Sequence, residues 1–186
     1  MYIDVFDRDD LIFVSYSMNP QAAVLIEQLG LEPHPEGGYY RETYRAPLDV
    51  DSVAHKGRRS AYTCIYFLLA GDQYSAWHRV ASDESWFFHM GSGVEIWSLI
   101  PSSGAAPIAL QVQTLGALDR FELAIPAGRW FAAKPVGTDG FALVSCVVAP
   151  GFVFEDFELA TRQHLLDEGW DKHNEWPLIE SLMIKA

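Results

Sequence analysis

Cysteine is scarce in this chain, which has only Cys64 and Cys146 among its 186 residues. Each lies in an apolar stretch and the sequence has no C-x-x-C motif, so it carries no disulfide framework. We interpret both as buried free thiols. This interpretation favours a reducing, cytoplasmic setting.

Long hydrophobic runs are also absent. None approaches the roughly 18 residues that a membrane-spanning helix needs. The N-terminal sequence MYIDVFDRDD is acidic and lacks the basic region of a secretory signal. We therefore expect no membrane as a partner.

Basic residues are few relative to acidic ones. The chain has 13 Lys and Arg against 25 Asp and Glu, which gives a formal net charge of -12. The field of such a protein repels phosphate groups. Nucleic acid and anionic membrane surfaces are accordingly not expected as partners.

Apolar and aromatic residues, by contrast, are plentiful. Hydrophobic residues make up 49% of the chain and aromatic residues 13%, which is typical of a globular protein and favours β-structure. The length fits one ordinary domain. We place this domain at residues 18–168, with an N-terminal extension at 1–17 and a C-terminal tail at 169–186.

Helix signals occur near both ends of the domain. Asn19 and Pro20 begin a helix that stops at Gly30, and Thr161 and Gly169 bound a second short helix. Between them, strand-length runs alternate with turn signals, as in an all-β barrel or sandwich. The runs lie at residues 37–45, 63–71, 73–80, 85–101, 106–115, 120–133 and 141–152.

Polar side chains stand among apolar ones on two neighbouring strands. The period of two puts His78 on one face with Val80, and Glu84 on one face with Trp86. If both faces line the interior, His78 and Glu84 converge in an apolar cavity, the usual form of a ligand site. The alternative is a structural hydrogen bond or a solvated corner. His89 has the opposite parity and is expected at the surface.

The spacing of these residues resembles a known motif. Gly71, His78, Glu84 and Gly91 resemble the first cupin motif, in which a second histidine would stand at Val80. The resemblance implies a cupin fold, a two-sheet antiparallel β-barrel with short terminal helices.

A second cupin motif is similar to Pro126-x-Gly128, with Phe131 in the place of its histidine. Four segments in order resemble the uncharacterised cupin family DUF985, or Cupin_5. They are LGLEPHPEGGYYRETYR, CIYFLLAG, IPAGRWFAAKP and APGFVFEDFELA. This likeness extends from residue 18 to about residue 168.

Cupin metal sites are built from three histidines and a glutamate. Only His78 and Glu84 match that set, and two protein ligands hold a divalent ion weakly. The resemblance therefore implies no firmly bound cofactor. A weak divalent metal on His78 and Glu84, completed by water, remains an open alternative.

A further likeness concerns ligand binding. Gly38-x-Tyr40-x-Glu42 is similar to a strand that holds the nucleotide in metal-free sugar-nucleotide epimerase cupins. An aromatic ring beside a carboxylate suits stacking and hydrogen bonding to a ring, and Arg41 can meet an anion. The expected ligand-binding residues are Tyr40, Arg41, Glu42, Trp86 and Phe131.

Three functions remain open. The first is a metal-independent enzyme of the isomerase or epimerase type that acts on a small polar, sugar-like or nucleotide-linked molecule. His78 would act as base or acid, with Glu84 tuning its pKa and Tyr66 or Tyr74 as the opposing proton donor. The second is a binding or sensor module without chemistry, and the third is a weak divalent-metal isomerase or dioxygenase.

A homodimer is also expected. Trp77, Phe87 and His89 have outward parity, and such residues are enriched in interfaces. The cupin resemblance implies a dimer in which Tyr40 or Glu42 of one subunit approaches His78 of the other. Alternatively, these aromatic side chains pack beneath the terminal helices of their own chain.

Overall fold

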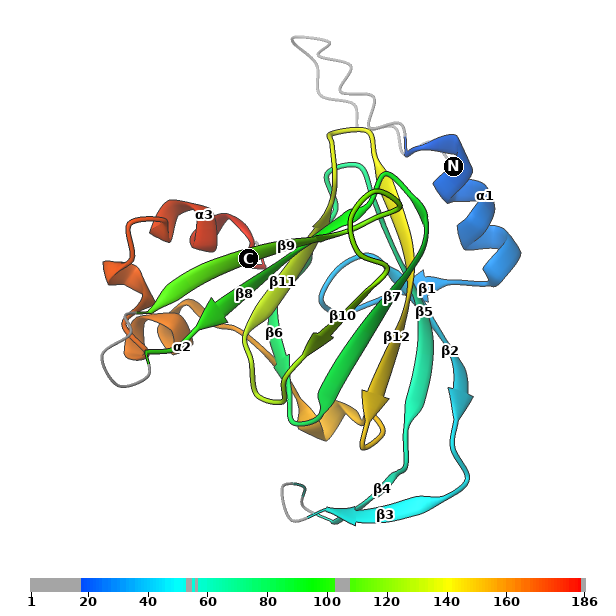
Figure 1. Ribbon diagram of the computed structural model, residues 1–186, viewed down its shortest axis with the longest axis horizontal. Coiled ribbons are helices and arrows are strands. Elements are labelled where there is room, and N and C mark those ends of the chain that lie inside the picture. Colours follow the sequence, from blue (N-terminus) through cyan, green and yellow to red (C-terminus); the bar gives the residue numbers. More distant parts are fainter. Residues whose placement is uncertain (1–17, 53–54, 56, 103–107, 185–186) are drawn as a thin grey trace, which may run out of the picture.

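A computed structural model describes residues 18–52, 55, 57–102 and 108–184. The predicted N-terminal extension at 1–17 lies outside the described residues. Two antiparallel sheets face one another, and short helices cover their outer faces (Figure 1). This arrangement confirms the all-β prediction.

One sheet has six strands and the other has five. In spatial order, the six-stranded sheet consists of β1 (Glu32–Pro33), β2 (Tyr39–Arg45), β5 (Thr63–Ala70), β12 (Phe141–Ala149), β7 (Asp83–Gly91) and β10 (Glu122–Ile125). The five-stranded sheet consists of β13 (Phe157–Leu159), β6 (Ser75–Val80), β11 (Phe131–Pro135), β8 (Val94–Ile100) and β9 (Ala109–Leu115).

A separate hairpin of β3 (Asp49–Ser52) and β4 (Gly57–Ser60) extends below the sheets (Figure 1). Sequence patterning missed it, because its strands carry charged and small residues and have no apolar face to signal β-structure.

The core lies between the two sheets. Inward-facing side chains alternate along each strand, so Phe67 and Trp86 of the six-stranded sheet meet Ile96 and Phe131 of the five-stranded sheet. All four are almost fully buried. Large apolar side chains on both inner faces fix the pairing register, since a one-residue slip would turn them outward.

Helix α1 (Pro20–Leu29) covers one end of the outer face of the six-stranded sheet (Figure 1). The side chain of Asn19 accepts hydrogen bonds from the first turn, and Gly30 ends the helix with φ 60°. Both capping predictions are therefore confirmed. Ala22 is fully buried against the sheet.

Three C-terminal elements cover the outer face of the five-stranded sheet. They are α2 (Arg162–Asp167), η2 (Trp170–Lys172) and α3 (Trp176–Ser181). Trp170 and Ile179 are buried there, so this part of the predicted C-terminal tail packs onto the domain. A further short helix, η1 (Phe154–Asp156), precedes β13.

Trp77 belongs to the same outer cluster. Its indole Nε1 donates to the carbonyl oxygen of Ile179 at 2.6 Å, and its side chain is buried. The interpretation of Trp77 as an interface residue is therefore wrong, because α3 already covers it. None of the helices in the described part of the chain has the length and apolar character required to cross a membrane.

Candidate functional site

A cavity of about 530 Å³ is lined by residues of both sheets. Its size is within the range of small-molecule sites. Aromatic rings make up much of its wall, namely Tyr40, Phe67, Trp86, Phe152, Phe154 and Phe157. Four imidazole and carboxyl groups with buried side chains line it: His34 and Glu36 from the turn before β2, His78 from β6 and Glu84 from β7.

The central polar contact of the cavity joins Glu36 and His78. Oε2 of Glu36 lies 3.3 Å from Nε2 of His78, and both side chains are buried. Ser75 donates its hydroxyl hydrogen to Oε1 of the same carboxyl group at 2.8 Å. Strand alternation predicts His78 beside Glu84, whereas the carboxyl group in contact with His78 is that of Glu36.

The hydrogen bonds of His78 assign its tautomer. Its Nδ1 lies 2.7 Å from the carbonyl oxygen of Ala76, which can only accept, so Nδ1 carries the proton. Burial lowers the pKa of His78 to about 3, and the ring is neutral. Nε2 therefore presents a lone pair to Glu36.

Glu36 is the matching acid. Burial, reinforced by the nearby charge of Glu84, raises the pKa of Glu36 well above its ordinary value. A protonated carboxyl group can donate to Nε2 of His78. The contact is thus a neutral acid–imidazole pair rather than a salt bridge.

His34 adds a second imidazole to this pair. Its Nδ1 lies 3.4 Å from Oε2 of Glu36 and accepts from the backbone N–H of the same residue. Burial lowers the pKa of His34 to about 4. One carboxyl oxygen of Glu36 consequently lies within reach of two neutral imidazoles, those of His34 and His78.

A tight turn places Glu36. The N–H of Gly37 donates to the carbonyl oxygen of His34, and the N–H of Ala76 donates to the carbonyl oxygen of Glu36. Gly37 has φ 110°, and a Cβ there would lie 2.1 Å from the carbonyl oxygen of Tyr74. Only glycine allows the turn to approach β6 so closely.

The sequence pattern does not mark His34 and Glu36 as site residues. Both precede β2, where no alternation assigns a face. The available signal was the Gly37–Gly38 pair, which marks a close backbone approach immediately after two titratable residues.

A β-bulge brings Ser75 and His78 onto one face of β6. Phe131 pairs with His78 and Ala133 pairs with Ser75, so β6 contains one extra residue between these pairs. Without the bulge, simple alternation would put Ser75 and His78 on opposite faces of β6, and Tyr74 would lie on the same face as His78. Instead, Tyr74 packs among the C-terminal elements, and its hydroxyl donates to the carbonyl oxygen of Met183.

The two tyrosines predicted as proton donors therefore lie outside the cavity. Tyr74 faces the C-terminal elements because of the bulge. Tyr66 alternates with Ile65 and Phe67, which pack in the core, so it lies on the outer face of the six-stranded sheet. Neither tyrosine lies among the residues that line the cavity.

Glu84 lines the deep wall of the cavity beside Trp86. Burial raises the pKa of Glu84 to about 7, while donors on Cys146 and Trp86 act in the opposite direction. Cys146 lies on the adjacent strand β12, opposite Trp86, and burial raises the pKa of its thiol. At neutral pH, Glu84 is therefore distributed between its acid and carboxylate forms.

The predicted ligand-binding residues mostly surround this cavity. Tyr40, Arg41 and Glu42 line it from β2, and Trp86 lines it from β7. Phe131 stands behind His78, with ring centroids 4.0 Å apart, so it supports the imidazole rather than forming the cavity surface.

The strand β2 serves the cavity of its own chain. The ring of Tyr40 meets that of His34 edge-on, with centroids 4.5 Å apart. Glu42 accepts two hydrogen bonds from Arg45, at 3.0 and 2.6 Å. Tyr40 and Glu42 thus line the cavity of their own chain.

The cupin fold raises the question of a metal. Among the described residues, no group of three or more His, Cys, Asp or Glu has the arrangement to hold an ion. Val80 and Phe131 occupy the two other ligand positions, and the nitrogens of His34 and His78 face the same carboxyl oxygen of Glu36. These side chains do not fit a cupin metal centre.

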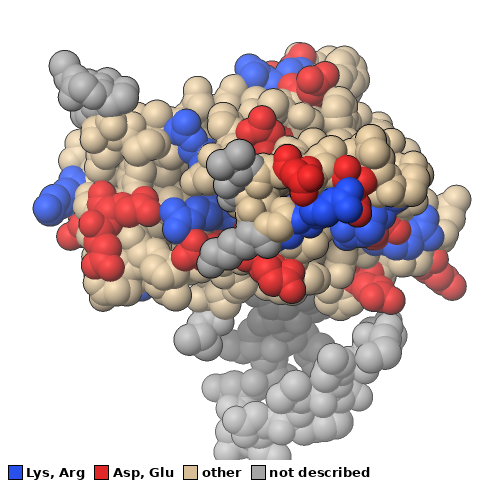
Figure 2. All heavy atoms as spheres, turned by 90° about the horizontal axis from the view of Figure 1, so that it is seen from below, with Lys and Arg blue, Asp and Glu red and all other residues tan. Residues whose placement is uncertain are grey.

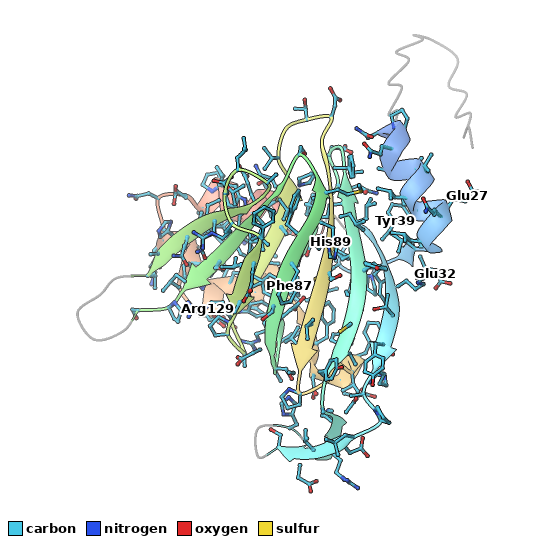
Figure 3. The ribbon with its side chains drawn as sticks, turned by 45° about the vertical axis from the view of Figure 1, so that its right-hand side comes forward. Glu27, Glu32, Tyr39, Phe87, His89 and Arg129 are labelled. Atoms are coloured by element: carbon cyan, nitrogen blue, oxygen red, sulfur yellow. The ribbon has the colours of Figure 1, made fainter. Side chains whose placement is uncertain are left out.

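The outer face of the six-stranded sheet carries Phe87 and His89 on β7 (Figure 3). His89 is exposed, as predicted, and its Nε2 lies 2.6 Å from the hydroxyl oxygen of Ser145. Phe87 is half-buried. Unlike Trp77, neither side chain is beneath a C-terminal helix.

Charged residues are mixed on the face seen in Figure 2. Lys and Arg side chains lie beside Asp and Glu side chains rather than forming a continuous basic surface. The described residues include a bidentate ion pair of Arg59 and Asp156, in which Nε and Nη2 of the guanidinium group donate to the carboxylate.

Comparison with known families decides what kind of protein carries this cavity. Residues 23–160 match the family model Cupin_5, described as Cupin superfamily (DUF985). The chain belongs to this family. The cupin resemblance and the β-barrel fold predicted from sequence are thereby confirmed. The matched range contains all four polar cavity residues and ends before α2.

This cupin is similar to two solved proteins in particular. One is a hypothetical protein from Leishmania major, at 34% identity over 88% of this chain and 99% of that chain, with a TM-score of 0.77. The other is a protein from Shewanella oneidensis, at 34% identity over 89% of this chain and 98% of that chain, with a TM-score of 0.75.

More distant cupins share the fold. A cupin 2 conserved barrel domain protein from Rhodopseudomonas palustris is 14% identical over 82% of this chain and 84% of that chain, with a TM-score of 0.52. Comparison with curated proteins gives no match.

Proposed function

We propose that this cupin binds a small polar, sugar-like molecule in its barrel and transfers protons on it, as an isomerase or epimerase does. The proposal is carried by one observation, the 3.3 Å contact between the carboxyl group of Glu36 and Nε2 of His78 inside the cavity. Buried titratable pairs with shifted pKa values are typical of proton-transfer sites.

The pair can complete a proton-transfer cycle. Nε2 of His78 takes a proton from a carbon of the ligand, and the carboxyl group of Glu36 gives its proton to an oxygen of the ligand. The imidazolium then returns a proton to the carboxylate across the 3.3 Å contact. No proton is gained or lost, and the pair returns to its neutral state.

The walls of the cavity support a ring-shaped ligand. Tyr40, Phe67, Phe154 and Phe157 offer flat apolar faces on which a sugar or base can stack. Arg41 stands at the rim, where it can meet an anionic group attached to the ring. A nucleotide-linked sugar satisfies both features.

A binding or sensor module is the second candidate. It is favoured by three aromatic residues of the cavity wall, here called the aromatic rim. They are Phe152, Phe154 and Phe157, whose rings contact one another edge-on. Such a rim holds a ligand whether or not a reaction follows. Under either function we expect a cytoplasmic homodimer with no intrinsic metal; the free thiols of Cys64 and Cys146 fit the reducing compartment.

Deuterium uptake tests the reaction. The protein is incubated with a panel of reducing sugars and sugar nucleotides in deuterium oxide, and loss of carbon-bound hydrogen signals is followed by NMR. We expect exchange or epimerisation of at least one compound. His78→Asn and Glu36→Gln should lower the rate by about a hundredfold or more.

The control is His89→Asn, which removes an exposed histidine on the outer face of the sheet. It should leave the rate unchanged. Tight binding without exchange would assign the protein to the binding class. Exchange that survives in both His78→Asn and Glu36→Gln would reject the proposed pair.

A further inference from the structure

The indole N–H of Trp86 has no hydrogen-bond partner among the residues that the structure describes. The side chain is 1% exposed and lines the cavity. Its ring is held edge-on by Phe67 and Phe131, with centroids 5.6 and 6.2 Å away. A buried N–H group normally has an acceptor, so this one calls for an explanation.

The described groups around Trp86 do not fully supply that acceptor. Glu84 lies two residues earlier on the same face of β7, and its carboxyl group approaches the indole without completing a hydrogen bond of normal geometry. Cys146 lies opposite on β12 and contributes a thiol, a weak donor. The wall of the cavity here therefore contains an indole N–H, a thiol and a carboxyl group that is in part protonated at neutral pH.

Such a set of donors matches a ligand oxygen that only accepts. A carbonyl oxygen has two lone pairs and no hydrogen, so it can accept from the indole N–H and from a carboxylic acid together. A hydroxyl group would bring a further donor hydrogen into a place already rich in donors. An anionic group is disfavoured, because the Glu84 carboxylate would place a like charge beside it.

We propose that the wall formed by Trp86 and Glu84 is a carbonyl-oxygen subsite, and that the ligand is an aldehyde or ketone. The inference rests on the proposed function and deepens it. Hydrogen bonds to a carbonyl oxygen stabilise the negative charge that develops there when a neighbouring carbon loses its proton. His78 and Glu36 line the same cavity and would handle that proton.

NMR of the indole N–H groups tests the subsite directly. The chain has six tryptophans, and the signal that disappears in Trp86→Phe belongs to Trp86. The probes are cyclohexanone, cyclohexanol and methylenecyclohexane, which share a ring and differ in the group that would meet Trp86. We expect cyclohexanone to shift the Trp86 N–H proton downfield and methylenecyclohexane to leave it nearly unchanged.

Affinity gives the second measurement. Cyclohexanone should bind about fivefold more tightly than either other probe, and Trp86→Phe should remove this preference, since one net hydrogen bond is lost. Trp97→Phe is the matched control, because the Trp97 indole donates to Glu95 and lies in the cluster outside the barrel. It should keep the preference.

Two results would overturn the carbonyl subsite. One is a Trp86 signal that does not respond to cyclohexanone, or responds equally to methylenecyclohexane. The other is tighter binding of cyclohexanol than of cyclohexanone. The wild-type spectra decide the matter even if Trp86→Phe does not fold.

Failure of the proposed function can be recognised separately. If cyclohexanone shifts the Trp86 signal but exchanges no hydrogen in deuterium oxide, the result supports the carbonyl subsite and rejects proton transfer by His78 and Glu36. If exchange occurs and Trp86→Phe changes neither affinity nor rate, the result rejects the carbonyl subsite and leaves the proposed function in place.

Discussion

Nε2 of His78 and Oε2 of Glu36 lie 3.3 Å apart in the interior of the barrel, joined as a neutral imidazole and a carboxylic acid. Burial produces this state, because the charged forms of both groups lose their hydration there. The same contact at the surface would be an ion pair. The pair is therefore suited to passing a proton without moving net charge.

The first prediction concerns the protonation of the buried histidines. His34 and His78 should both stay neutral from about pH 5 to about pH 8, because burial disfavours their charged forms. Ring-nitrogen NMR shifts measure this, and those of His78 should show the proton on Nδ1. A His78 ring that titrates near 6.5, its ordinary value, would contradict the assignment.

The second prediction links Glu84 to stability. In the unfolded chain Glu84 loses its proton near pH 4.5, whereas in the fold its pKa is about 7. Between these values the folded state holds a proton that the unfolded state has released, so the free energy of unfolding falls as pH rises. From below pH 4.5 to above pH 7 this loss amounts to about 3 kcal/mol.

Glu84→Gln has no such proton to release. Relative to the wild type, the variant should gain about 3 kcal/mol in free energy of unfolding between acid and mildly alkaline solution. Urea denaturation of both proteins at each pH measures the difference, in which the contributions of His34 and His78 largely cancel. Glu36 adds to the difference in the same direction, because the charge of Glu84 raises its pKa in the wild type. Two parallel stability curves would show that Glu84 titrates normally.

The third prediction concerns the turn that positions Glu36. Gly37→Ala puts a Cβ 2.1 Å from a backbone oxygen in addition to the strain of φ 110°. Gly137→Ala is the matched control, because φ is 80° there but no atom lies within 4 Å of the added Cβ. We expect a cost of about 1 kcal/mol at Gly137 and of about 3 kcal/mol or more at Gly37.

Chemical denaturation measures both costs. If Gly37→Ala folds, it should also lose proton-transfer activity, because the displaced turn carries Glu36. Equal costs at the two glycines would mean that the contact with β6 is not tight.

The fourth prediction is a homodimer through the outer face of the six-stranded sheet. Phe87 and His89 lie there on β7 (Figure 3), and the exposed Met90 follows them on the same strand. Light scattering should give twice the chain mass of 20.9 kDa. Phe87→Glu should give the monomer mass, because a charge buried in an apolar interface is costly.

Val24→Glu is the control, since Val24 is 59% exposed on α1. It should leave the mass unchanged. A wild-type mass of one chain would reject the dimer, and a dimer that survives Phe87→Glu would move the interface elsewhere.

The fifth prediction concerns metal. Untagged protein should retain well below one equivalent of transition metal after dialysis, because Val80 and Phe131 cannot ligate and two ligands bind weakly. Elemental analysis measures the content. A stoichiometric ion would favour the metalloenzyme alternative, and its loss in His78→Asn would place it in this cavity.

The sequence by itself determined the local features of this protein. Asn19, Pro20 and Gly30 bound α1 as their backbone preferences require. Alternating strands gave the all-β class, and ordered motifs gave the cupin family. These features depend on short-range patterns, in which each residue's preference is expressed whatever lies across the fold.

The tertiary structure decided which side chains share the site. His78 and Glu84 were both predicted for the cavity wall, yet the partner of His78 is Glu36, brought in by the turn at Gly37. A single extra residue in β6 turned Ser75 inward and Tyr74 outward. Contacts between distant parts of the chain determine both the bulge in β6 and the approach of the turn at Gly37. Alternation along one strand reveals neither of them.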